Sequence, residues 1–248
     1  MMVEQDTASG ELRGHWERVA EQWIRWARLP GHDAFWSYRE EFRRFVPLPG
    51  VATLEVGCGE GRIARELTRL GHTVTAVDRS ETLVRAARAA ASAARYVRAD
   101  ASQLPFVDNS FDRVVAYNML MDVDDMLAVI TEAARVLCPG GVLTVSVVHP
   151  LTDRGDFVDS TPDAGFVVQG SYYERRRVRA TEARNGLSMD FASWSYPLGD
   201  YVAALREAGL AVTHLAEPRP ADTAASRAGR WDRIPLFCWL NAQHLRNQ

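Results

Sequence analysis

The sequence predicts an α/β protein with a mostly parallel sheet and helices on both of its faces. Between Val51 and Val148, short apolar runs alternate with segments whose apolar residues recur at helical spacing. The turn Pro139-Gly140-Gly141 separates the last helical segment from the last of these runs. Strands that alternate with helices are typical of parallel strands joined by crossover helices.

The first predicted elements are aromatic helices. The pattern is helical over residues 11–46, and Pro30-Gly31 divides it into helices at 11–28 and 33–46. We expect this segment to form a helical cap on a core at residues 51–150. The core elements are strands at 51–56, 73–77, 94–98, 111–116 and 142–148, with helices at 61–70, 81–94 and 126–137.

The last hundred residues depart from this alternation. Strands at 166–179 and 187–196, joined near Asn185-Gly186, form a predicted antiparallel hairpin within a lid insertion at 151–197. A C-terminal part follows at 198–248. It contains a predicted helix at 198–208 before Gly209, strands at 210–215 and 235–242, and a mobile loop at 217–230. We interpret residues 1–248 as a single domain.

Composition restricts the class of function. The chain has 248 residues, of which 47% are hydrophobic and 25% charged, and its formal net charge is −3. This charge provides no general attraction for nucleic acid or an anionic membrane surface. No apolar run reaches the roughly 20 residues that span a bilayer. The first ten residues also lack the apolar centre of a signal peptide. We expect a cytoplasmic protein without nucleic-acid or membrane partners, and the sequence carries no signal for an oligomeric state.

The cysteines indicate neither a disulfide framework nor a metal site. Cys58, Cys138 and Cys238 are far apart, odd in number and form no C-x-x-C pair. We interpret Cys58 as a small structural residue in a glycine-rich loop, and we expect no bound metal.

Three glycines follow the first predicted strand and open the first core helix. They are Gly57, Gly59 and Gly61. A dinucleotide-binding loop has the spacing G-x-G-x-x-G, and its third glycine would stand where this chain has Arg62. The tighter spacing turns the chain sharply and brings its backbone close to a ligand. Glu55 precedes the turn, where its carboxylate would attract a cationic amino group and repel a pyrophosphate.

Two further acids stand where predicted strands end. Asp78 closes the second strand, and an acid at this place accepts hydrogen bonds from a ribose diol in dinucleotide-binding folds. Asp100 follows the third strand and could accept from an adenine amino group beside the backbone N–H of Ala101. Together with Glu55, these acids lie at the edge where open α/β sheets bind ligands.

These features resemble the class I S-adenosylmethionine-dependent methyltransferases, in particular the small-molecule branch similar to the ubiquinone-biosynthesis type. The resemblance covers about Thr53 to Val148, including the segments Phe111–Val115 and Ala134–Gly141. It implies S-adenosylmethionine as cofactor and S-adenosylhomocysteine as product. It also implies a Rossmann-like, seven-stranded, mostly parallel sheet whose last strand runs antiparallel.

The resemblance further assigns the expected cofactor contacts. The glycine loop would hold the methionine moiety, Asp78 the ribose and Asp100 the adenine. Arg62 could pair with the methionine carboxylate or remain a solvated helix residue. The residues expected at the cofactor are Glu55, Gly57, Cys58, Gly59, Gly61, Asp78, Arg79, Asp100, Ala101, Tyr117 and Asn118.

His149 is the expected catalytic residue. Methyl transfer needs in-line positioning of the nucleophile and removal of its proton. His149 directly follows the fifth strand, so we expect it to face the cleft, and an imidazole can accept a proton near neutral pH. The alternative is a histidine satisfied by backbone groups beside Pro150.

An acid cluster after the fourth strand permits two interpretations. Asp122, Asp124 and Asp125 could bind Mg²⁺ for a catechol-type reaction. They could equally cap the helix that begins near Met126, which is the favoured interpretation because only Asp153 offers a partner carboxylate after strand five. Tyr117-Asn118 lacks the prolines found in methyltransferases that act on adenine amino groups, so that target is not favoured.

Aromatic residues of the cap and lid are the expected acceptor contacts. They are Trp16, His32 and Tyr38, with His15 beside them, and Tyr172 and Tyr173 of the hairpin. The basic run after Tyr173 could touch RNA. A solvent-facing lid strand fits the acidic net charge better.

The sequence therefore predicts transfer of a methyl group to an O, N or C atom of a small metabolite. One alternative is a fold of the same kind used for non-methyl chemistry such as cyclisation. Another is a non-catalytic module that binds S-adenosylmethionine. An RNA methyltransferase is less favoured.

Overall fold

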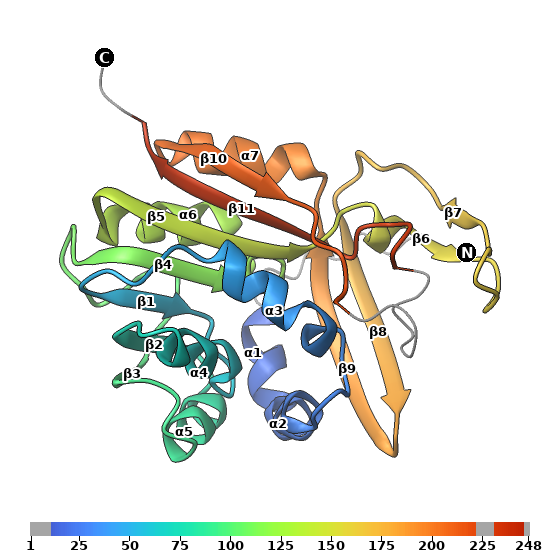
Figure 1. Cartoon of the computed structure of the whole chain (residues 1–248), viewed down its shortest axis with the longest axis horizontal. Coiled ribbons are helices and arrows are strands. Elements are labelled where there is room, and N and C mark those ends of the chain that lie inside the picture. Colours follow the sequence, from blue (N-terminus) through green and yellow to red (C-terminus); the bar gives the residue numbers. More distant parts are fainter. Residues whose placement is uncertain (1–10, 222–230, 246–248) are drawn as a thin grey trace.

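The centre of the protein is a seven-stranded sheet, seen in a computed structural model that describes residues 11–221 and 231–245 (Figure 1). Its strands are β1 Thr53–Val56, β2 Val74–Asp78, β3 Arg95–Arg98, β4 Phe111–Tyr117, β5 Leu137–Val148, β10 Leu210–Ala216 and β11 Phe237–His244. The strand order is β10-β11-β5-β4-β1-β2-β3. Strands β1 to β5 are parallel, and β11 is antiparallel to both of its neighbours. The predicted fold class is confirmed, including the antiparallel last strand.

Helices cover both faces because the strands present apolar side chains to both. The helices are α1 Glu11–Arg18, α2 Ala20–Arg28, α3 Phe35–Phe45, α4 Arg62–Arg69, α5 Glu81–Ala89, α6 Met126–Val136 and α7 Leu198–Glu207. Side chains alternate along β4. Val114 and Ala116 join the buried cluster beneath α6 and α7, and Val115 and Tyr117 join the cluster beneath α3 and α4. None of the helices within the described residues is long and apolar enough to cross a membrane.

Two small antiparallel sheets lie outside the central one. Strands β6 Gly155–Phe157 and β7 Phe166–Val168 form the first, and β8 Arg176–Arg184 and β9 Leu187–Ser195 form the second. The predicted turn at Asn185-Gly186 is confirmed, because both residues have positive φ, 50° and 75°. Positive φ at both positions is the requirement of a type I′ hairpin turn.

The prediction of one strand over residues 166–179 is wrong. Strand β7 ends at Val168, the chain turns at Gly170, which has positive φ, and the next strand begins only at Arg176. Between them, the buried guanidinium of Arg154 donates to the backbone carbonyl oxygens of Ser171 (3.0 Å) and Glu174. This side chain therefore holds the connection in a turn conformation that cannot pair as a strand.

The predicted boundaries shift elsewhere by a few residues. The helix expected at 11–28 is interrupted at Val19, although Val19 N–H still donates to His15 and Trp23 N–H to Val19. Of the loop expected at 217–230, residues 222–230 lie outside the described part of the chain.

Gly61 is required where the glycine loop enters α4. Its φ is +88°, and an added Cβ would lie 2.3 Å from Ser92 Oγ and 3.0 Å from Ala87 Cβ. Gly71 has a similar φ of +92°, but a Cβ there would meet only Pro49 Cγ at 3.7 Å. The two positions therefore share backbone strain and differ in available space.

We expect Gly71→Ala to lower the free energy of unfolding by about 1–2 kcal/mol through strain alone. Gly61→Ala should cost about 2 kcal/mol more, because the methyl group is forced against packed neighbours. Urea unfolding of both variants measures the difference. Equal losses would show that the space behind Gly61 relaxes freely.

Candidate active site

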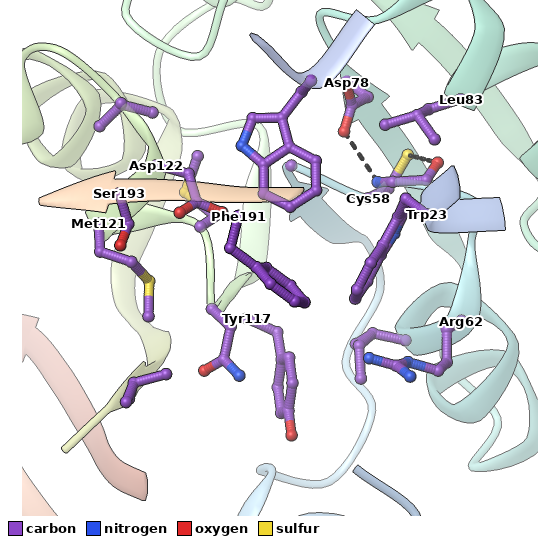
Figure 2. Close-up of a pocket in the computed structure, with 18 of the residues that line it drawn as sticks. Trp23, Cys58, Arg62, Asp78, Leu83, Tyr117, Met121, Asp122, Phe191 and Ser193 are labelled. Carbon is purple, nitrogen blue, oxygen red and sulfur yellow. Dashed lines mark hydrogen bonds between the residues drawn. The ribbon is translucent and has the colours of Figure 1, made fainter. Parts of the chain in front are cut away.

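A cavity of about 1000 Å³ opens at the carboxyl ends of the strands. Its floor is formed by residues that directly follow the strands β1 to β4, and its walls come from α1, α2, α3 and the β8–β9 hairpin. Figure 2 shows side chains from these separate elements converging on one space. The position agrees with the expectation for an open α/β sheet.

The hairpin and the N-terminal helices form a roof together. Trp26 and Met189 are buried against one another with Val19, and Trp23 and Phe191 pack on this group. Polar contacts join the same elements. The ring Nε2 of His15 lies 3.0 Å from the carbonyl oxygen of Asp190, and Asp190 N–H donates to Gln22 Oε1 at 3.0 Å. In Figure 1, α2 and β9 lie beside each other below the sheet.

Polar contacts also join the roof to the segments that follow β1 and β2. Glu17 of α1 accepts hydrogen bonds from the hydroxyl groups of Ser80 and Thr82, the latter at 2.7 Å. Arg28 of α2 pairs with Glu60 at 2.9 Å. These contacts close the cavity on the side of the glycine loop.

Asp78 organises the glycine loop. Its Oδ2 accepts from Gly59 N–H at 2.8 Å, and its Oδ1 accepts from Ser80 N–H at 2.8 Å. Burial raises the pKa of Asp78, while the two backbone donors oppose that rise. Gly57 has φ +70°, and a Cβ there would lie 2.8 Å from Met119 Cβ. The loop thus follows a path that only glycine fits.

Glu55 is a buried carboxyl with an unsatisfied oxygen. It is 2% exposed, and its Oε2 has no hydrogen-bond partner within the described residues. Burial raises the pKa of Glu55 well above its usual range, and the neighbouring carboxyls of Asp78 and Glu60 raise it further. A cationic group that entered the cavity beside Glu55 would supply the missing partner.

Asp100 lies at the same edge of the sheet. Its Oδ1 accepts from the N–H and the hydroxyl of Ser102 at 3.0 and 2.8 Å, and Arg79 approaches its Oδ2 at 3.4 Å. Glu55, Asp78 and Asp100 all line the cavity. The predicted convergence of the three acids is therefore present.

The structure brings most of the expected cofactor residues together. Every one of them except Gly61 lines the cavity. Gly61 instead faces Ser92 and Ala87 behind the loop. Cys58 is buried, and burial raises the pKa of its thiol well above the usual range, in keeping with a structural role.

Only some of the residues expected to contact the acceptor line the cavity. Trp16 and Tyr38 line the cavity. His32 is buried edge-on against Trp26, with ring centroids 4.2 Å apart, and does not line it. Tyr172 and Tyr173 also lie elsewhere. The Tyr172 hydroxyl accepts from Leu198 N–H at 3.1 Å, and Tyr173 is 83% exposed.

His149 does not line the cavity either. Its Nδ1 accepts from Leu151 N–H at 3.1 Å, and its Nε2 lies 2.9 Å from Glu217 Oε1. Burial lowers the pKa of His149, and Glu217 opposes this. Both ring nitrogens are therefore engaged away from the site. The assignment of His149 as a base stays a prediction without support from its position.

The acids after β4 have separate surroundings. Asp125 caps α6, because its side chain accepts from Ala128 N–H at 2.9 Å, which confirms the capping interpretation for this residue. Asp124 lies 3.9 Å from Arg177. Within residues 11–221 and 231–245, no group of three or more His, Cys, Asp or Glu side chains could hold a metal ion. Asp122 lines the cavity.

Several lining residues were not anticipated. Phe191 reaches from β9 into the space beside Trp23, and Met121 and Ser193 lie on its other side (Figure 2). In the sequence, only the alternation of side chains along the predicted hairpin strand indicated that Phe191 could face the cavity. Arg62 is paired with Asp33 at 2.6 Å and lies over the Phe35 ring at 4.3 Å, so it is not a solvated helix residue.

Comparisons with known proteins agree with this geometry. The family described as the methyltransferase domain matches residues 54–145. The chain is 31% identical over 178 residues to a malonyl-[acyl-carrier protein] O-methyltransferase of Enterobacter lignolyticus, which covers 68% of each protein. It is 39% identical over 113 residues to a ubiquinone biosynthesis O-methyltransferase of Xanthomonas campestris, which covers 42% of this chain and 46% of that protein.

A solved structure shows the same fold. It is an S-adenosylmethionine-dependent methyltransferase from Mesorhizobium loti with a TM-score of 0.68 and 24% identity, matched over 86% of this chain and 98% of that one. The sheet order, the glycine loop with its three acids and the relatives lead to one conclusion. The chain belongs to the class I S-adenosylmethionine-dependent methyltransferases.

Proposed function

We propose that the protein methylates a small apolar molecule that binds beside S-adenosylmethionine within the cavity described above. The observation that carries this proposal is the size of the cavity. Small-molecule sites usually occupy about 300–1,000 Å³, and this one has about 1000 Å³. It therefore offers room for the cofactor and for a second molecule.

The cofactor fits the polar floor of the cavity. Glu55, whose buried Oε2 lacks a partner, would bind the methionine ammonium group. Asp78 would accept from the ribose hydroxyls, and Asp100 with Ala101 would contact the adenine. When bound, S-adenosylmethionine supplies an activated methyl group on its sulfonium. The residues of the chain bind and orient the two molecules and keep water away.

The acceptor would lie under the roof. The aromatic side chains of the roof that line the cavity are Trp16, Trp23, Trp26, Phe35, Tyr38 and Phe191, and Tyr117, Trp231 and Phe237 line other parts of it. In this proposal residues 11–46 act as the cap and 151–197 as the lid, both parts of one domain that also includes 51–150 and 198–248. Arg154 would be the main anchor of the lid, since it also donates to Ser195 at 3.2 Å.

Protein contacts already engage the basic run of the hairpin, which supports a small-molecule acceptor over RNA. Arg175 pairs with Asp200, Arg176 donates to the carbonyl oxygen of Asp153, and Arg177 lies 4.3 Å from the centre of the Trp194 ring. The three free cysteines suit the cytoplasmic location that forms part of this proposal.

The proposal is tested by incubating the protein with S-adenosylmethionine and a panel of apolar amines, phenols and carboxylic acids. We expect S-adenosylhomocysteine and a product heavier by one methylene to form together, as measured by mass spectrometry. A changed acceptor without S-adenosylhomocysteine would indicate non-methyl chemistry. Tight cofactor binding with no product from any acceptor would indicate a binding module.

A further inference from the structure

One end of the cavity is acidic. Met121, Asp122, Asp153, Phe191 and Ser193 line it, and we call these residues the acceptor end. Asp122 ends the short 3₁₀ turn that follows β4, and Asp153 lies in the turn that follows β5. Figure 2 shows Met121, Asp122 and Ser193 side by side next to Phe191. The acceptor end thus joins the carboxyl ends of two neighbouring strands to the hairpin roof.

Neither carboxyl of the acceptor end makes an ion pair with another described residue. The Asp122 side chain makes no hydrogen bond or ion pair with any residue in 11–221 or 231–245. Burial raises the pKa of Asp122 well above its usual range, and Asp153 and Asp78 raise it further. Burial also raises the pKa of Asp153 to about 6, against the effects of a hydrogen bond with Ser195 and of the charges of Arg154 and Arg176. Negative charge here is therefore costly without a positive ligand.

The arginines nearest to Asp153 bind backbone oxygens instead. The guanidinium of Arg154 donates to Ser171, Glu174 and Ser195, and that of Arg176 donates to the carbonyl oxygen of Asp153 itself. Neither arginine lines the cavity.

The cations that do line the cavity are occupied or distant. Arg62 is paired with Asp33, Arg79 with Asp100, and Arg98 with Glu81. Arg184 remains, at the turn end of β8. Arg176, whose guanidinium donates to Asp153, begins that strand eight residues earlier, which corresponds to about 26 Å along an extended chain. Among the described residues that line the cavity, no unpaired cation lies at the acceptor end to compensate an anionic acceptor.

The apolar wall suits a cation as well. Aromatic faces attract ammonium groups when water is excluded. Phe191 borders the acceptor end, Trp23 lies on the other side of Phe191, and Tyr117 lies below the two (Figure 2). An aromatic wall next to two unpaired carboxyls is a combination that binds an apolar body carrying a positive charge.

We propose that the methyl acceptor is a hydrophobic amine whose ammonium group binds between Asp122 and Asp153. This inference rests on the proposed methyltransferase function and adds the class of acceptor. A bound ammonium group would transfer one proton to a carboxylate of the pair, which leaves a neutral amine with a free lone pair and a protonated acid. The carboxyl pair therefore serves first as the binding partner and then as the proton acceptor.

The test compares three probes of the same shape and different charge. Tryptamine is cationic, tryptophol is neutral and indole-3-acetate is anionic. Their affinities are measured by isothermal titration calorimetry on protein saturated with S-adenosylhomocysteine. We expect tryptamine to bind at least about tenfold more tightly than the other two, as for a charge-assisted hydrogen bond to a partly buried carboxylate.

The Asp122→Asn, Asp153→Asn double variant should lose this preference and retain its affinity for S-adenosylhomocysteine. The exposed Asp163→Asn variant, which carries the same chemical change away from the cavity, should keep the preference. If a thermal melt shows that the double variant is not folded, the inference is tested by the comparison of the three probes on the unchanged protein alone.

Equal or tighter binding of indole-3-acetate or tryptophol would overturn the inference. So would the absence of tryptamine binding, or a preference that survives in a folded double variant. Failure of S-adenosylhomocysteine itself to bind would instead overturn the proposed function. The two failures are therefore distinguishable in the same experiment.

Discussion

Replacing Glu55 by Gln should make the protein more stable above neutral pH and weaken its affinity for S-adenosylhomocysteine. Burial raises the pKa of Glu55, and Asp78 and Glu60 add to the rise. The folded state therefore binds a proton on Glu55 at pH values where the unfolded chain, with an ordinary pKa of about 4.3, has released it. Stability falls as the pH rises between the ordinary and the raised pKa. Glutamine carries no charge and removes this loss.

The stability effect is measured as the difference in unfolding free energy between Glu55→Gln and the unchanged protein at several pH values. Between the ordinary and the raised pKa of Glu55, this difference in unfolding free energy should grow by up to about 1.4 kcal/mol per pH unit, because one proton is bound on folding. Glu60→Gln is the matched control. Glu60 is also buried, but it pairs with Arg28 at 2.9 Å and Arg65 at 2.7 Å. Its replacement breaks both ion pairs of a buried carboxylate and should destabilise the protein.

The affinity effect depends on which part of the cofactor Glu55 contacts. Loss of a hydrogen bond to a charged group costs about 1.5–3 kcal/mol, or roughly 10–100-fold in affinity. Glu55→Gln should therefore weaken S-adenosylhomocysteine by about that factor. It should leave 5′-methylthioadenosine, which has no amino acid part, unaffected. A variant that weakens both ligands equally would place Glu55 away from the methionine moiety.

The cofactor side of the site could be predicted because its signals are local. Gly57 and Gly59 follow a strand directly, and Glu55, Asp78 and Asp100 stand at strand ends. The carboxyl ends of parallel strands meet at one edge, so adjacency in sequence becomes adjacency in space. The order of the strands was enough to place these residues together, and the family resemblance assigned their contacts with the cofactor.

The acceptor side depends on contacts between distant segments. Gln22 and Asp190, which join cap and hairpin, are 168 residues apart. No local pattern specifies that pairing, so neither Trp23 nor Phe191 could be assigned to the cavity. Tyr172 was misplaced because the strand expected at 166–179 is two separate strands.

His149 illustrates the limit of a strand-end argument. Val148 lines the cavity. Successive side chains of a strand point to opposite sides. His149 N–H donates to Leu236 at 2.9 Å, and its ring turns toward Glu217. Val148 therefore forms part of the cavity wall, whereas the side chain of the next residue, His149, lies behind that wall.

Replacing Asp78 by Ala should abolish most cofactor affinity. The carboxylate would accept from the ribose diol, and it also holds Gly59 N–H and Ser80 N–H at 2.8 Å. Loss of two charge-assisted hydrogen bonds corresponds to about 100-fold or more in affinity. The ribose is common to S-adenosylhomocysteine and 5′-methylthioadenosine. Both ligands should therefore weaken by a similar factor, in contrast to the result for Glu55→Gln.

Asp112→Ala separates this effect from general destabilisation. Asp112 Oδ2 also accepts from two backbone N–H groups, those of Val51 at 2.6 Å and Ala52 at 3.0 Å. It lies near the start of β4, at the opposite end of the sheet from the cavity. Asp78→Ala should lose about 2 kcal/mol of unfolding free energy, and Asp112→Ala should lose no more than this, because the exposed N–H of Val51 can bind water instead. Only Asp78→Ala should lose affinity in calorimetric titration. Equal affinities for the two variants would mean that Asp78 shapes the loop without contacting the ribose.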